Sequence, residues 1–151
     1  MERPTRILLA VRVGDPSAGP AETAAWLAST LGARLSILYV ATELRTAPEV
    51  GLRARIPDEE VQTRMRQAAR ERTEAWGKEA LGEVPFDVIV EDGDVAERVA
   101  AVAAAEGAQL VVVGTEGRGA IRGMILGDTT REILRQCPCP VVVVPPGVRK
   151  G

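Results

Sequence analysis

The most constraining feature of this 151-residue chain is one stretch that runs from residue 111 to residue 132. Residues 111–113 are three valines, a composition typical of a strand buried in a parallel sheet. Glycines follow at 114, 117, 119, 123 and 127, and glycine lets a ligand approach the backbone closely. Thr129 and Glu132 then have capping-box spacing, which predicts the start of a helix. A strand, a glycine loop and a helix N-terminus in this order form an anion cradle suited to phosphate.

Two common phosphate-binding loops do not match the spacing of these glycines. A Walker loop has Lys and then Ser or Thr after its last glycine, whereas Ala120 and Ile121 follow Gly119. The dinucleotide fingerprint also fails, because Gly123 comes one residue too late. What remains is Gly114-x-x-Gly117, nine residues, and then Gly127. This spacing resembles the ATP-binding loop of the universal stress protein family, G-x2-G-x9-G-[S/T].

Other segments of the chain resemble the same family. Residues 7–11 and 35–40 resemble its first two strands, residues 93–97 the turn into its third helix, and residues 139–144 its closing strand. The resemblance implies a single-domain α/β fold of the Rossmann-like type. It also implies an open, parallel, five-stranded sheet in the order 3-2-1-4-5, with helices on both faces.

The residues themselves predict strands that alternate with helices, a pattern typical of a parallel sheet with right-handed crossovers. We expect strands at residues 6–13, 34–41, 86–90, 110–113 and 141–144, and helices from 20 to about 31, from 58, from 94 to 107, and from 130 to about 136. The first helix should bury Ala24, Trp26, Leu27 and Leu31. The second should carry an apolar stripe of Val61, Met65, Ala68, Ala69 and Trp76, with a solvated face of Arg64, Arg66, Arg70 and Arg72. Residues 42–57 lack periodicity, so we expect a solvated loop there, with a lid or a partner contact as the alternative.

Composition limits the classes of function. A formal net charge of −2 argues against general affinity for nucleic acid. No apolar run approaches the length needed to span a bilayer, and no targeting segment is recognisable, so we expect a cytoplasmic protein. The absence of His removes the commonest general base and metal ligand.

In the implied strand order, the first and fourth strands are neighbours whose connections leave on opposite sides of the sheet. Their carboxyl ends should therefore open a crevice, which is the usual ligand site of such sheets. The resemblance to the family places ATP there. The candidate binding residues are Ala10, Val11, Arg12, Val40, Gly114, Gly117, Arg118, Gly127, Asp128, Thr129 and Thr130.

Two positions in this set depart from the family pattern. Arg12 stands where ATP-binding members usually have Asp, and Asp128 stands where they have Ser or Thr. A carboxylate about 5 Å from a phosphate charge costs roughly 3 kcal/mol at an effective dielectric constant near 20. Four interpretations stay open: Asp128 fills the cradle itself, it binds Mg²⁺ that bridges to phosphate, the phosphate shifts to Thr129 and Thr130, or Arg12 supplies a compensating cation.

Three classes of function compete. The first is a non-catalytic adenine-nucleotide-binding signalling module that acts through a protein partner of unknown identity. The second is a nucleotide-free interaction protein, and the third is a weak ATPase. Residues 141–144 form an uncharged β-branched strand at a predicted sheet edge, so we expect a homodimer through this strand, as the resemblance also implies.

The two cysteines, Cys137 and Cys139, are one residue apart in Cys-Pro-Cys-Pro. Two ligands do not complete a zinc site, and the chain has no other cysteine and no histidine. We therefore expect structural thiols that are buried or half-buried.

Overall fold

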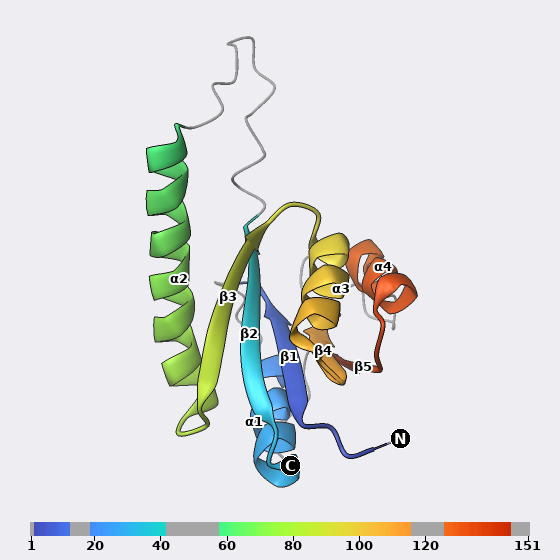
Figure 1. Ribbon diagram of the computed structural model, residues 1–151. Helices are drawn as coiled ribbons and strands as arrows, with labels where there is room; N and C mark the ends of the chain where they lie inside the picture. Colours follow the sequence, from blue (N-terminus) through green and yellow to red (C-terminus); the bar gives the residue numbers. More distant parts are fainter. Residues whose placement is uncertain (1, 13–18, 42–57, 116–125, 146–151) are drawn as a thin grey trace.

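The computed structural model describes residues 2–12, 19–41, 58–115 and 126–145, and they form one five-stranded parallel sheet (Figure 1). The strand order is β3-β2-β1-β4-β5, as expected. The strands are β1 (Arg6–Val11), β2 (Arg34–Ala41), β3 (Phe86–Asp92), β4 (Leu110–Gly114) and β5 (Val141–Val144). The helices are α1 (Gly19–Leu31), α2 (Glu59–Leu81), α3 (Val95–Glu106) and α4 (Asp128–Gln136).

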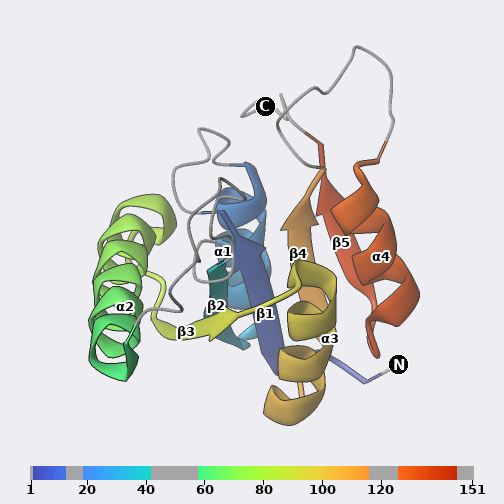
Figure 2. The same ribbon diagram turned by 90° about the horizontal axis from the view of Figure 1, so that it is seen from above.

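Helices cover both faces of the sheet, as predicted (Figure 2). Successive side chains of a strand point to opposite faces, so each strand contributes to two cores. Ile7 and Leu9 of β1 pack with α1, whereas Leu8 packs with α3. Because both faces are buried, the central strands β1 and β4 consist mostly of Val, Ile and Leu, which is consistent with a core that has few aromatic residues.

The start of α3 follows its predicted sequence signal, whereas the start of α4 does not. The carboxylate of Asp94 accepts a hydrogen bond from the backbone N–H of Glu97 at 3.0 Å, so the predicted cap of α3 is confirmed. The capping box predicted for α4 is wrong. The helix begins at Asp128 with Gly127 as its cap residue, so Thr129 lies inside the first turn.

The predicted apolar faces of α1 and α2 need correction. Trp26 is 66% exposed, because the buried face of α1 runs through Ala21, Ala24 and Ala28, and two residues along a helix turn the side chain about 200° away. In α2 the predicted stripe residues Val61, Met65 and Ala68 are exposed. The buried residues are Ala69, Thr73, Gly77 and Leu81. Figure 1 shows why, since the first turns of α2 extend beyond the carboxyl ends of the strands.

Candidate functional site

The carboxyl ends of β1 and β4 form the candidate site. These two strands are neighbours, with Ile7 opposite Leu110 and Leu9 opposite Val112. Helix α1 follows β1 on one face of the sheet, and α4 follows β4 on the other. The two chain connections therefore diverge at the point where an open α/β sheet binds its ligands.

Most of the predicted binding residues belong to the elements that end or begin here. Ala10 and Val11 end β1, and Arg12 follows them with an exposed side chain. Val40 is the second-last residue of β2 and is buried on the α3 face. Gly114 ends β4, and Gly127, Asp128, Thr129 and Thr130 form the start of α4. Gly117 and Arg118 lie outside the described residues, as do Glu116 and segment 42–57.

A buried hydrogen bond joins the strand end to the helix start. The hydroxyl of Thr130 donates to the carbonyl oxygen of Gly114 at 3.0 Å, and Thr130 is only 2% exposed. This bond fixes the first turn of α4 against the end of β4. Because its hydroxyl proton is already engaged, the side chain of Thr130 positions the start of the helix.

The glycines at this site serve packing rather than unusual backbone angles. Gly114 is not among the described glycines with positive φ, which are Gly32, Gly82, Gly93 and Gly107. A Cβ atom at Gly114 would lie 3.3 Å from Cγ of Pro20, so glycine is required here because α1 begins directly against the strand end. Gly127 has φ −62° and ψ 160°, which any residue can adopt. Neither glycine therefore adopts the positive φ that glycine permits.

The start of α4 offers hydrogen-bond donors. The first backbone N–H groups of a helix have no partner within the helix, and the first to bond within α4 belongs to Arg131, which donates to Gly127 at 3.1 Å. The N–H groups of Asp128, Thr129 and Thr130 make no hydrogen bond to another described residue. The positive end of the helix dipole adds about 0.3–1 kcal/mol for an anion.

Asp128 opposes this attraction, although less than the sequence alone suggests. Its side chain is exposed and makes no hydrogen bond or ion pair with another described residue. Solvent raises the effective dielectric constant, and in bulk water the repulsion at about 5 Å falls to roughly 0.8 kcal/mol. We therefore place the penalty between about 0.8 and 3 kcal/mol.

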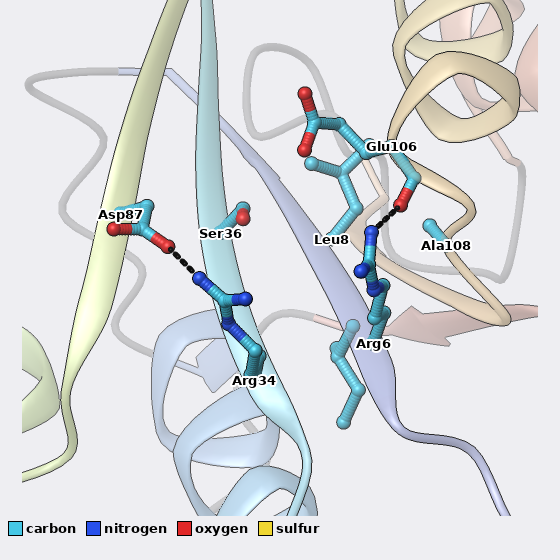
Figure 3. Close-up of a pocket in the computed structure, with 8 residues that line it drawn as sticks. Arg6, Leu8, Arg34, Ser36, Asp87, Glu106 and Ala108 are labelled. Atoms are coloured by element: carbon cyan, nitrogen blue, oxygen red, sulfur yellow. Dashed lines mark hydrogen bonds and ion pairs between the residues drawn. The ribbon is translucent and has the colours of Figure 1, made fainter.

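A second hollow, of about 60 Å³, lies at the opposite, amino end of the sheet (Figure 3). Arg6 and Arg34 stand opposite each other on β1 and β2. Arg6 donates to the carbonyl oxygen of Glu106 at 2.7 Å, and Arg34 pairs with Asp87 at 3.5 Å. Sequence reasoning missed this hollow. Each cation already has an acceptor, so the crevice remains the candidate site.

Two arginines of α2 have roles that the sequence did not indicate. Arg70 donates to the carbonyl oxygen of Val88 in β3 at 2.8 Å, and Arg66 pairs with Asp92 at the end of β3 at 2.7 Å. All four arginines of the predicted face are exposed, as expected, but these two also bond to β3. Both connect α2 to the edge strand of the sheet.

The cysteine pair lies in the turn between α4 and β5. Both thiols are half-buried, as expected, and their sulfur atoms are 3.8 Å apart. Burial, the adjacent Cys137 thiol and the hydrogen bond between them raise the pKa of Cys139 from 9.0 to about 12. No group of three or more metal-ligating His, Cys, Asp or Glu residues occurs in the described part of the chain. Within the same residues, no helix is long and apolar enough to cross a membrane.

The sequence model of the universal stress protein family matches residues 4–145, which include every strand and helix. The chain belongs to the universal stress protein family. The Thermus aquaticus protein named "Universal stress protein in QAH/OAS sulfhydrylase 3'region" is 32% identical over 139 residues, covering 91% of this chain and 96% of that protein.

Solved structures of the family share the fold of this universal stress protein. A universal stress protein in complex with cAMP is 19% identical, with a TM-score of 0.60, and the match covers 95% of this chain and 98% of that one. The Archaeoglobus fulgidus protein in complex with dAMP is 16% identical, with a TM-score of 0.63, and the match covers 92% and 96%. The bound nucleotides belong to those proteins, and the similarity itself establishes the fold.

Proposed function

We propose that this universal stress protein is a non-catalytic signalling module that binds an adenine nucleotide and acts as a homodimer. The observation that carries the proposal is the free helix terminus of α4, fixed at the carboxyl ends of β1 and β4 by the bond from Thr130 to Gly114. That arrangement presents backbone donors to phosphate. Two structures with the same fold hold cAMP and dAMP, which supports an adenine nucleotide as the ligand.

The number of phosphate groups that a bound nucleotide can carry depends on Asp128. A carboxylate in the first turn of α4 repels each added phosphate charge, so the penalty grows from a monophosphate to ATP. ATP remains the ligand that the loop spacing implies, and Mg²⁺ bound with it would bring Asp128 to the phosphates as an oxygen ligand. An exposed carboxylate can turn toward such an ion without breaking a bond to another described residue.

We propose binding rather than catalysis because phosphoryl transfer needs a positioned base or metal ligands at the γ-phosphate. The sequence offers Asp128, Glu116 and Arg118 near that position, none of them at a known catalytic spacing. A weak ATPase is the alternative, and an assay for released phosphate distinguishes the two.

The proposed dimer forms through β5. The backbone N–H of Val111 donates to the carbonyl oxygen of Pro140 at 3.0 Å, so residue 140 faces β4. In a parallel ladder every second residue faces the same neighbour, so Val142 and Val144 also face β4, while Val141 and Val143 face outward. A second β5 related by a two-fold axis would pair with these outward groups. The dimer would then bind an unidentified protein partner.

The first test is mass analysis of any nucleotide released when the purified protein is denatured, followed by titration of ATP and AMP into nucleotide-free protein. We expect Asp128→Ser to tighten ATP binding without Mg²⁺ by roughly 5- to 100-fold, and AMP binding by less. Asp87→Ser is the matched control, because it removes the same charge at the amino end of the sheet.

Three outcomes would change the proposal. If neither nucleotide binds the parent or Asp128→Ser, the protein is a nucleotide-free interaction protein. If Asp128→Ser weakens ATP binding only when Mg²⁺ is present, Asp128 is a ligand of the metal ion. An unchanged affinity for ATP in both conditions would show that the charge of Asp128 does not reach the phosphates.

A further inference from the structure

Cys137 and Cys139 bring two thiol groups together at the turn between α4 and β5. Their sulfur atoms lie 3.8 Å apart on one side of the turn between α4 and β5. Both side chains contact the core on the α3 face, yet each keeps part of its surface in solvent. The pair therefore lies at the boundary between the core and solvent.

The separation of the sulfur atoms favours a bridging ion over a disulfide bond. A disulfide would require the sulfur atoms to approach from 3.8 Å to about 2.05 Å. Pro138 lies between the cysteines and Pro140 follows them, and both prolines fix their own φ angle, which opposes such a movement. In contrast, two metal–sulfur bonds of about 2.3 Å at the roughly 120° angle of a three-coordinate ion place the sulfur atoms about 4.0 Å apart, so such an ion needs almost no rearrangement from the observed 3.8 Å.

We propose that Cys137 and Cys139 form a two-thiolate site for a soft metal ion, Cu⁺ in particular. Binding forms two metal–sulfur bonds and releases both thiol protons to solvent. Soft thiolate sulfur selects Cu⁺ among the common ions, and Cu⁺ accepts as few as two or three sulfur ligands. Zn²⁺ needs four ligands, and no group of three candidate ligands occurs in the described residues. A small external thiol would supply the third ligand of Cu⁺.

The site has few competitors within the chain, which makes the proposal easy to test. The sequence contains no histidine, no other cysteine and only three methionines. The ion would also hold the backbone in place between α4, which belongs to the candidate nucleotide site, and β5, which is the proposed dimer strand. The N–H of Cys137 donates to the carbonyl oxygen of Ile133 at the end of α4, and Pro140 directly precedes β5.

The test is anaerobic titration of Cu⁺ held by the chromogenic chelator bicinchoninate. The reduced parent protein should remove one Cu⁺ per chain from the chelator. Cys137→Ser and Cys139→Ser, which replace sulfur by a hard oxygen of similar size, should each weaken binding by at least tenfold. Met65→Leu, which removes an exposed thioether elsewhere, should bind like the parent.

X-ray absorption at the copper edge of the loaded parent provides a second measurement that does not depend on any variant folding. We expect three sulfur atoms to dominate the copper environment, two from the protein and one from the external thiol. The proposal is overturned if the chelator keeps its Cu⁺ in the presence of the parent, if either serine variant loses less than tenfold in affinity, or if nitrogen and oxygen dominate the copper environment.

Discussion

The two edge strands of the sheet, β3 and β5, differ in how well they are protected against pairing with another chain. Strand β3 is seven residues long, carries Asp87, Glu91 and Asp92, and is joined to α2 by Arg66 and Arg70. Strand β5 is four residues long and consists only of valine. Its first three residues remain half-exposed. Charged residues and covering helices are the usual protection of an edge strand against pairing with another chain.

The comparison indicates which edge is available for assembly. At β3 the guanidinium group of Arg70 donates a hydrogen bond to the carbonyl oxygen of Val88. An approaching strand would otherwise bond to this carbonyl oxygen. At β5 the prolines at 140 and 145 limit the length of the strand but leave Val141 and Val143 without a strand on their outward side among the described residues. A second copy at β5 therefore gains hydrogen bonds and apolar burial, whereas a copy at β3 would first have to displace a side chain.

The largest effect is expected at the open edge. Val143→Pro removes one outward N–H group but no bond to β4, and proline is tolerated where the N–H side of an edge strand is free. In a two-fold symmetric dimer the substitution removes one intermolecular hydrogen bond from each chain. The dissociation constant of the dimer should therefore rise at least about 100-fold. Light scattering over a dilution series, with thermal melting as the folding check, measures it.

Val143→Thr is the matched control, because it keeps both the branched shape and the N–H group. It should remain dimeric. A monomeric parent, or a Val143→Pro variant that dimerises like the parent, would show that β5 is not the interface.

The next effect concerns the packing beneath the protected edge. A Cβ atom at Gly77, in the interior of α2, would lie 2.6 Å from Cζ of Phe86 and 2.8 Å from Cδ1 of Ile37. Alanine is better than glycine in a helix by about 1 kcal/mol, yet overpacking costs about 1–3 kcal/mol. Gly77→Ala should therefore lower the free energy of unfolding by up to about 2 kcal/mol, against the direction that helix propensity predicts.

Chemical denaturation measures this change, and a double variant sharpens it. Phe86→Leu shortens the side chain that the new methyl group meets, so Gly77→Ala should cost less in that background. If Gly77→Ala stabilises the parent, α2 moves away from β3 easily and the β3 edge is less firmly held than the contacts indicate.

The elements with strong local signals were predictable from the sequence. The bounds of β2 and β5 are those expected, since both are runs of mostly apolar residues, and Pro140 and Pro145 flank the four valines of β5. Asp94 and Glu97 fix the start of α3 through a bond between residues three apart. The strand order, however, came from the resemblance to the family, since periodicity does not show which strands are neighbours.

The features that sequence reasoning missed depend on contacts between distant residues. Pro20 packs against Gly114, and Arg70 reaches Val88 across the space between a helix and a strand. Trp26 was assigned to the core because it is large and apolar, but its angular position on α1 faces solvent. In the candidate site, the spacing of the glycines indicated the location, whereas the role of Thr130 required the geometry of its bond to Gly114.

The smallest expected effect tests the protection of β3 directly. Arg70→Met keeps most of the apolar stem of the side chain and removes the guanidinium group. The carbonyl group of Val88 then relies on water, which should cost about 0.5–1.5 kcal/mol of unfolding free energy. More importantly, it opens the edge of β3, so the variant should aggregate faster on mild heating than Arg72→Met, which removes an exposed arginine from the same helix. Equal aggregation rates would show that the cover provided by α2, and not the bond from Arg70, protects this edge.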